Sequence, residues 1–190
     1  MILLIGFPKS GTSSFQKLFT ECGYKTVHWK YGDKYIGTII KNNKKNNRPL
    51  LAGLEKLDGI TQMDVCISPE DCYWPQLTDY KQLYYENRDA VFILNKRNPK
   101  DLLISFKNWN SYHERLYKYN PELIPDKSDE GFIYFVQNHY NEIEMFFASL
   151  PQAKFISYDI NKDTIDKLTK YIDLKGKTIF PKINVNTKKN

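Results

Sequence analysis

A glycine-rich stretch near the start of the chain, GFPKSGTSSF at residues 6–15, contains residue types that bind phosphate. The stretch contains two glycines, Gly6 and Gly11, with Lys9 between them. Three hydroxyl-bearing residues come directly after the second glycine: Thr12, Ser13 and Ser14. A glycine-rich turn between a buried strand and a helix points backbone N–H groups at one spot, where the helix dipole adds positive charge. The stretch therefore predicts an anion site, which Lys9 supplies with a movable cation.

The position of the lysine separates this stretch from the common nucleotide-binding loop G-x-x-x-x-G-K-[ST], in which lysine follows the second glycine. Here Thr12 follows the second glycine and Lys9 lies inside the loop. The loop alone allows any phosphate ligand, and a turn that merely needs glycine is the plain structural alternative.

A second group of residues lies in KRNPKDLLISF, at 96–106. Arg97 ends an apolar run, and Ser105 follows eight positions later, about two helical turns on. The carboxyl ends of parallel strands open on the same edge of a sheet, so Arg97 is expected near Lys9. Arginine binds phosphate through two parallel hydrogen bonds, which suits a terminal phosphate. The structural alternative for Arg97 is an exposed residue at the end of a strand. For Ser105, taken alone, an ordinary serine in a helix is the preferred interpretation.

The hydrophobic pattern predicts strands that alternate with helices. The expected strands are 2–6, 24–29, 57–63, 89–97 and 153–160. The expected helices are 11–23, about 33–42, 98–119, 129–150 and 161–174, with Asn98 and Asn161 as caps of two of them. A further helix is expected to begin in SPEDCYWPQL with Ser68 as its cap, and the basic tail after residue 174 is expected to be extended. This alternation predicts one three-layer α/β/α domain over residues 1–190 with a mostly parallel central sheet.

Composition narrows the classes of partner. The net charge of +6 favours anionic ligands, but the charge is dispersed, and only KNNKKNN and the tail form local basic clusters. We therefore expect no nucleic-acid partner. Three cysteines without zinc spacing indicate reduced thiols, and no stretch is long enough to span a membrane, which together predict a soluble cytoplasmic protein.

The two motifs, PKSGTSS and RNPKDLLIS, together resemble the sulfotransferases that use 3′-phosphoadenylyl sulfate (PAPS). That family carries a P-K-[ST]-G-T-T-type loop after its first strand and an R-[DN]-P-x-[DE]-x-x-x-S element later. Further stretches resemble the short sulfotransferase-like branch, among them LDGITQMDVCISPEDCYWPQL, HYNEIEMFFASLPQAKFISYDI and FPKIN. The resemblance runs from residue 2 to about 184 and implies a P-loop-like sulfotransferase fold.

Carried over position by position, the resemblance implies two sets of binding residues. The 5′-phosphosulfate would be held by the loop and its flanks: Pro8, Lys9, Ser10, Gly11, Thr12, Ser13 and Ser14. Arg97 and Ser105 would hold the 3′-phosphate. Lys9 would also stabilise charge on the departing phosphate, and by resemblance no metal is needed. Ser13 and Ser14 replace the Thr and Trp of the small-molecule branch, which leaves the adenine-stacking residue unassigned.

Transfer to an acceptor hydroxyl or amine needs a general base. His28 ends the second expected strand on the same sheet edge as the loop and is the first candidate; a structural strand-end histidine is the alternative. Asp64, after the third expected strand, is the second candidate. His113 and His139 fall on expected helices and are assigned structural or surface positions.

Two other classes of function remain open at this point. A small-molecule kinase shares the strand–loop–helix start, but it places lysine after the second glycine and needs a carboxylate for Mg²⁺. A non-catalytic module that binds polyanions agrees with the charge of +6 but predicts a basic stripe with aromatic residues. The sequence favours transfer of a sulfuryl group from PAPS, with release of PAP (3′-phosphoadenosine 5′-phosphate), to a small-molecule or glycan acceptor.

Overall fold

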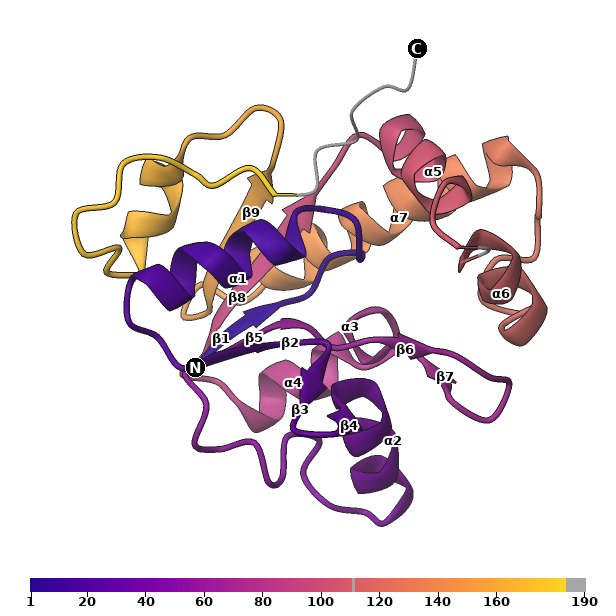
Figure 1. Cartoon of the computed structure of the whole chain (residues 1–190), viewed down its shortest axis with the longest axis horizontal. Coiled ribbons are helices and arrows are strands. Elements are labelled where there is room, and N and C mark those ends of the chain that lie inside the picture. The colour runs from indigo at the N-terminus through magenta and orange to yellow at the C-terminus, as the bar shows by residue number, and fades with distance from the viewer. Residues whose placement is uncertain (111, 184–190) are drawn as a thin grey trace.

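The computed structural model describes residues 1–110 and 112–183. A mostly parallel sheet lies at its centre (Figure 1). Its strands within the described residues are β1 (Ile2–Leu4), β2 (Thr26–His28), β3 (Lys30–Tyr31), β4 (Lys34–Tyr35), β5 (Gly59–Gln62), β8 (Val91–Lys96) and β9 (Lys154–Asp159). The spatial order is β4-β3-β2-β5-β1-β8-β9. The strands from β2 to β9 in this order pair in parallel, whereas β3 and β4 form an antiparallel hairpin at one edge.

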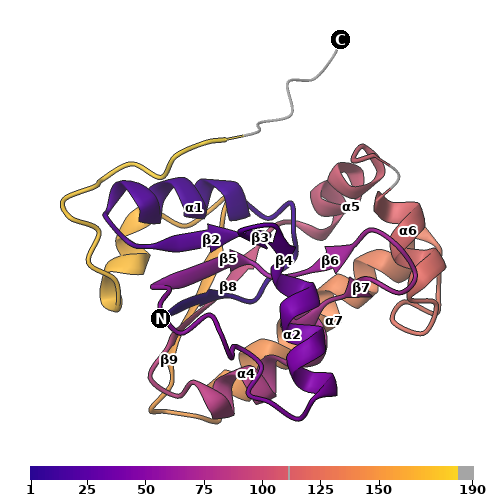
Figure 2. The same ribbon diagram turned by 60° about the horizontal axis from the view of Figure 1, so that its bottom comes forward.

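Helices cover both faces of this sheet (Figures 1 and 2). They are α1 (Thr12–Glu21), α2 (Ile36–Lys45), α3 (Pro75–Thr78), α4 (Tyr80–Glu86), α5 (Pro99–Lys107), α6 (Tyr112–Tyr119), α7 (Asp129–Ala148) and a 3₁₀ helix, η1 (Ile165–Lys170). The arrangement confirms the predicted α/β fold with helices on both sides of a mostly parallel sheet.

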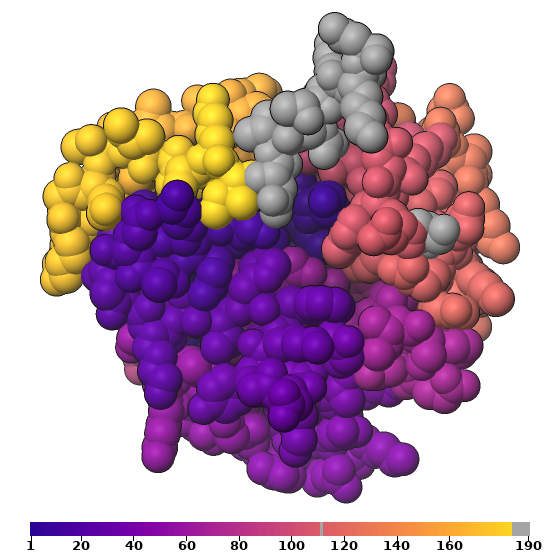
Figure 3. Space-filling model, viewed as in Figure 1, coloured from indigo at the N-terminus to yellow at the C-terminus, as the bar shows by residue number. Residues whose placement is uncertain are grey.

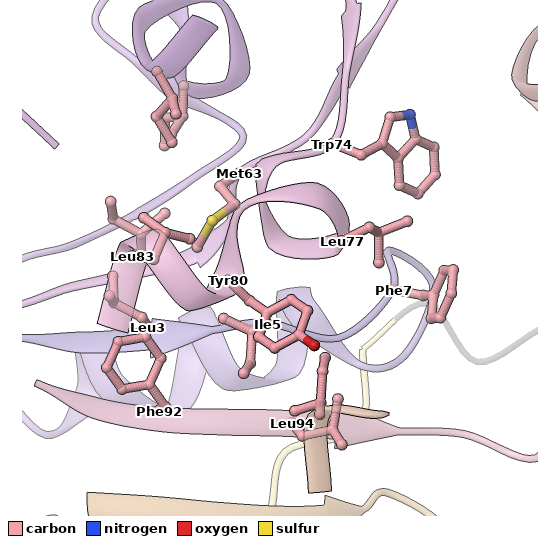
Figure 4. Packing of buried hydrophobic residues seen from close by; sticks show 14 of the residues in the cluster. Leu3, Ile5, Phe7, Met63, Trp74, Leu77, Tyr80, Leu83, Phe92 and Leu94 are labelled. Atoms are coloured by element: carbon pink, nitrogen blue, oxygen red, sulfur yellow. The ribbon is translucent and has the colours of Figure 1, made fainter. Parts of the chain in front are cut away.

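The side chains of β1 show why the central strands are apolar throughout. Leu3 packs into a cluster with residues of α4 and α7, whereas Ile2 and Leu4 pack into a second cluster with residues of α1 and η1. Successive side chains of a strand point to opposite faces, so a strand covered on both sides needs an apolar residue at every position. Figure 4 shows the first cluster, where Leu3, Phe92 and Leu94 from the sheet lie against Leu83 and Tyr80.

Two expected helices differ from the structure. The helix expected over 98–119 is divided into α5 and α6, and Asn110 between them has φ 41°. Asparagine tolerates this left-handed backbone better than most residues, so the Asn-rich stretch after Lys107 ends the helix. Residue 111 lies outside the described residues. The closing helix expected over 161–174 is the shorter η1, which begins after Thr164 rather than Asn161.

The helix expected to begin at Ser68 is absent from its place. A small hairpin of β6 (Val65–Cys66) and β7 (Cys72–Tyr73) occupies this stretch, and the backbone N–H of Asp71 donates to the Ser68 carbonyl in its turn. The pairing of β6 with β7 and a disulfide between Cys66 and Cys72 hold this stretch as a hairpin, which explains why no helix begins at Ser68. The helix begins later, at Pro75.

The disulfide corrects the prediction of three reduced thiols. Cys22 alone of the cysteines is free, and it is buried. Disulfides persist mainly in oxidising surroundings, so the cysteines no longer support a cytoplasmic location. No helix in the described residues is long and apolar enough to cross a membrane.

The helix expected over about 33–42 begins later, as α2 at Ile36, because the unpredicted strands β3 and β4 come before it. The other predicted boundaries agree closely with the structure. The side chain of Asn98 accepts a hydrogen bond from the Lys100 N–H and caps α5 as expected. Gly23, with φ 85°, follows α1. After η1 the chain returns along α1, and Figure 3 shows this segment lying against the N-terminal residues. The tail expected to be extended carries no helix or strand up to residue 183, and the rest of it lies outside the described residues.

The disulfide predicts a simple labelling result. Unfolded protein without reductant should take up one alkylating group, on Cys22, and three after reduction. Reduction should also lower the free energy of unfolding by about 2 kcal/mol, because the cross-link limits the freedom of the unfolded chain. Mass spectrometry and urea unfolding measure the two effects. Three labels without reductant would contradict the cross-link.

Candidate active site

The glycine-rich loop connects β1 to α1 and has two residues in the left-handed region. Lys9 has φ 67° and Gly11 has φ 80°, and Gly11 is the N-cap of α1. Such a backbone turns successive N–H groups toward one side and forms a concave anion site at the positive end of the helix. Gly11 is the position that needs glycine for its backbone. Lys9 adopts a conformation that costs a lysine free energy and is typical of functional loops.

A buried asparagine, Asn95 in β8, holds the loop in place. Its side-chain oxygen accepts a hydrogen bond from the Gly6 N–H at 2.9 Å, and its amide group donates to the carbonyls of Ser10 at 3.1 Å and Phe7 at 3.4 Å. A Cβ on Gly6 would lie 2.3 Å from the Asn95 backbone carbonyl oxygen, so only glycine allows this approach. Asn95 was not among the site residues predicted from the sequence, although a polar residue inside an apolar strand was the available signal.

A cavity of about 700 Å³ opens over the loop. Most of the residues selected from the sequence line it: Lys9, Gly11, Thr12, Ser13, Ser14, His28, Arg97 and Ser105. Other residues that line the cavity were not among the predicted site residues: Gln62, Trp109, Tyr158, Ile160, Asn161, Asp163, Phe180, Pro181, Lys182 and Ile183. The fold therefore gathers residues from α1, β2, β5, α5, β9, the loops after β1 and β8 and the C-terminal segment around one space.

Two cations of the cavity lie close to each other. The Arg97 side chain donates from Nη1 to the Lys9 carbonyl at 2.9 Å, and Arg97 Nε is buried without a partner among the described residues. The Lys9 ammonium lies 4.7 Å from the centre of the Trp109 ring. Burial and the neighbouring Arg97 lower the pKa of Lys9. An anion bound between them would reverse this effect and would offer Arg97 Nε an acceptor.

His28 also lines the cavity and contacts the start of α1. Its Nε2 is 3.1 Å from the Thr12 hydroxyl oxygen, and the Thr12 hydroxyl in turn donates to Gln62 Oε1 at 3.1 Å. Burial lowers the pKa of His28 to about 4, so the imidazole is neutral near pH 7. A neutral imidazole on the wall of an anion-binding cavity has a lone pair with which to accept a proton.

Three selected residues do not line the cavity: Pro8, Ser10 and Asp64. Ser10 is fully buried, and its carbonyl accepts from Asn95. Asp64 is 1% exposed, which leaves no room for an acceptor molecule to reach it directly. Burial raises the pKa of Asp64 to about 6, although Tyr112, Gln76 and Gln62 donate to its carboxylate.

The C-terminal segment completes the cavity, which the sequence had not indicated. The Ile183 N–H donates to the Ser14 hydroxyl at 3.2 Å, and the Phe180 ring packs edge-on against Phe15 with 4.9 Å between ring centres. Phe180 also lies 5.5 Å from Tyr158. Aromatic surface thus lies beside Ser14, the position where the small-molecule sulfotransferases carry tryptophan.

The other two histidines lie outside the cavity. His139 is buried in α7 among Phe7, Phe135 and Tyr80, and burial lowers its pKa to about 4. His113 packs against Tyr117 in α6. Both agree with the structural positions expected from the sequence.

The environment of His28 predicts its titration. In ¹H–¹⁵N spectra of the imidazole groups, His28 should stay neutral as the pH falls from 8 and should become protonated only near pH 4. Inorganic phosphate should raise the pKa of His28, because a bound anion stabilises the imidazolium. His139 is the internal control, since its pKa is also about 4 but it lies outside the cavity. A His28 that titrates near 6.5 and ignores phosphate would contradict this description.

Comparison with known proteins adds evidence independent of these contacts. The family described as "Sulfotransferase domain" matches residues 1–121, which include the loop, His28, Arg97 and Ser105. No curated protein matches the chain. Among solved structures, the YorR protein in complex with phosphorylated GDP from Bacillus subtilis is similar in 89% of this chain and 91% of its own, with 15% identity and a TM-score of 0.49. The matched residues make up more than half of this chain, and the chain therefore belongs to the sulfotransferase domain family.

Proposed function

We propose that the protein transfers a sulfuryl group from PAPS to a hydroxyl or amine group of a small-molecule or glycan acceptor. The observation that carries this proposal is the meeting of two anion-binding groups in one cavity. The loop before α1 provides backbone N–H groups and Lys9, Arg97 follows β8 directly, and Ser105 lies in α5. A nucleotide with phosphate on both its 5′ and 3′ positions has the matching pair of anions, and the family membership gives the reaction class.

The roles of the loop and Lys9 in this proposal are electrostatic. Sulfuryl transfer resembles phosphoryl transfer in that positioning and charge stabilisation do most of the work. The new S–O or S–N bond forms to the acceptor while the bond from sulfur to the bridging phosphate oxygen breaks. Lys9 stabilises the negative charge that collects on this oxygen, and the loop N–H groups hold the phosphate that leaves as part of PAP.

Arg97 and Ser105 are assigned to the 3′-phosphate. Arg97 Nε is a buried donor that has no partner among the described residues, and a buried donor without a partner costs about 1–3 kcal/mol. A phosphate oxygen would satisfy it. Ser105 lines the same cavity from α5 and is almost fully buried, so its hydroxyl has little access to bulk water.

His28 is assigned as the general base that takes the proton from the acceptor. Its pKa of about 4, lowered by burial, keeps it unprotonated near pH 7. A bound PAPS anion would strengthen His28 as a base, and the positive charge that develops on the acceptor as the new bond forms makes the acceptor's proton easier to remove. Asp64, the second candidate, is shut off from the cavity and is not retained as the base.

The alternatives receive less support from the site. A kinase of the P-loop type needs a carboxylate near the phosphates for Mg²⁺, and Asp163 is the acidic residue among those lining the cavity. One oxygen of its carboxylate, Oδ2, already accepts hydrogen bonds from the Asp159 N–H and the Lys167 ammonium. A polyanion-binding module requires an extended basic surface, whereas Lys9 and Arg97 line a cavity.

Ligand binding tests the donor. PAP should raise the thermal midpoint, because a ligand that binds only the folded state stabilises it, by about 2.7 kcal/mol at 100 times its Kd. ATP with Mg²⁺ and a single-stranded oligonucleotide should raise it much less. A larger shift with either of them would favour the kinase or the polyanion-binding module.

Substitution of Arg97 tests the 3′-phosphate assignment in the same assay. Arg97→Ala should weaken PAP roughly 10- to 100-fold, the effect of losing a charged hydrogen bond, and should leave 5′-AMP nearly unchanged. Lys100→Ala is the matched control, because it removes one positive charge from the exposed first turn of α5 outside the cavity. Equal losses for PAP and 5′-AMP in Arg97→Ala would contradict the assignment.

Substitution of His28 tests the base. His28→Ala should lower kcat by about 10²- to 10⁴-fold, the contribution of a general base, while PAP still binds. Transfer from radiolabelled PAPS to a panel of sugars, phenols and amines gives kcat, and thermal shift gives binding. His113→Gln, outside the cavity, is the control and should keep its activity. Unchanged turnover in His28→Ala would remove His28 from the mechanism.

A further inference from the structure

A continuous chain of hydrogen bonds leads from the buried Asp64 to His28. Asp64 Oδ2 is 3.4 Å from Gln62 Nε2, Gln62 Oε1 is 3.1 Å from the Thr12 hydroxyl, and Thr12 is 3.1 Å from His28 Nε2. This series of hydrogen bonds begins in the interior at Asp64, which does not line the cavity, and ends at His28, which does. Gln62 has no role in the proposed binding of PAPS, so this series of hydrogen bonds requires its own explanation.

The backbone is arranged to bring these side chains together. β2 and β5 pair with Val27 opposite Ile60, and then the register shifts so that His28 lies opposite Gln62 instead of Thr61. The next residue, Trp29, has φ 65° and donates its N–H to the Gln62 carbonyl at 3.0 Å. A left-handed tryptophan is strained, and irregular pairing of this kind re-aims side chains near functional sites.

Asp64 fixes the direction of the first link. An ionised carboxylate only accepts hydrogen bonds, and three neutral donors surround this one: Tyr112 at 2.9 Å, Gln76 at 3.2 Å and Gln62. The amide NH₂ of Gln62 must therefore face Asp64. The Gln62 carbonyl oxygen then faces Thr12 and can only accept.

The remaining links follow from this direction. The single hydroxyl proton of Thr12 is donated to Gln62, so the Thr12 oxygen is left to accept from His28. His28 must then carry its proton on Nε2, and Nδ1 keeps the free lone pair. His28 Nδ1 makes no hydrogen bond to any residue of the protein that the structure describes.

We propose that Asp64 is a positioning residue, which acts through Gln62 and Thr12 to hold His28 in the Nε2–H tautomer with Nδ1 free as the base. This inference rests on the proposed role of His28. It gives Asp64 a function that its burial permits, and it adds Gln62 as a second positioning residue. A carboxylate that holds the correct tautomer of a catalytic histidine directly is worth ~10⁴ in kcat in the serine proteases.

The tautomer is measured directly on the full-length protein without any ligand. In ¹⁵N-labelled protein at pH 7, long-range ¹H–¹⁵N correlation spectra distinguish protonated from unprotonated imidazole nitrogens. The wild type should show His28 protonated on Nε2. Gln62→Met removes the acceptor of Thr12, whose hydroxyl is then free to donate to His28, so the Nδ1–H form should gain at least tenfold relative to wild type.

Three more variants separate positioning from general stability. Asp64→Leu should produce a mixture of tautomers, because the Gln62 amide is no longer oriented. Asp64→Asn should retain the Nε2–H form, since its Oδ1 still accepts from Gln62 while its amide donates to Gln76 Oε1, which lacks a partner among the described residues. Gln76→Met, which removes a donor to Asp64 outside the chain of contacts, is the matched control and should not change the tautomer.

The outcomes distinguish this inference from the proposed function. A wild type with the Nδ1–H form, or a Gln62→Met protein that keeps the wild-type tautomer, overturns the inference whether or not Asp64→Leu folds. In the transfer assay, Gln62→Met should lower kcat at least about tenfold with PAP affinity retained, as expected for loss of an oriented base. Absence of transfer by the wild-type protein would instead count against the proposed function and would leave the tautomer result standing.

Discussion

The attachment of the glycine-rich loop to the neighbouring strand is the constraint on which the site depends. Asn95 uses its side-chain oxygen and amide group to bind three backbone groups of the loop, and it does so from a fully buried position. A buried amide must have its hydrogen bonds made, because leaving them unmade costs more than making them gains. These hydrogen bonds therefore fix the position of the loop against β8. Gly6 permits the approach, and Arg97, two residues after Asn95, is brought to the Lys9 carbonyl.

The cavity brings together two kinds of chemical group. Lys9 and Arg97 supply positive charge, and Arg97 Nε is left without a partner among the described residues. His28 supplies a neutral imidazole at the end of a series of hydrogen bonds that starts at a buried carboxylate. This combination suits a reaction in which an anionic donor binds and the acceptor loses a proton.

Local sequence patterns predicted most of the elements but not how they end or join. The central strands β1 and β8 were recognisable because both of their faces are covered, so their residues are apolar in succession. The break between α5 and α6 was missed because the helical periodicity continues across it, although Asn110 takes a left-handed backbone. The β6–β7 hairpin was mistaken for the start of a helix, since its pairing and disulfide involve residues whose contact a turn-and-cap pattern does not reveal.

The sequence by itself determined the groups whose function depends on neighbours along the chain. Lys9, Gly11 and Thr12 act through one turn, and Arg97 and Ser105 are placed by the end of one strand and the helix after it. Tertiary structure alone decided what depends on residues far apart. It put Asn95 under the loop, His28 opposite Gln62, Asp64 beneath Gln62, and Phe180 beside Phe15. The physical reason is that hydrogen bonds and packing between distant strands depend on register and burial, which arise only when the sheet assembles.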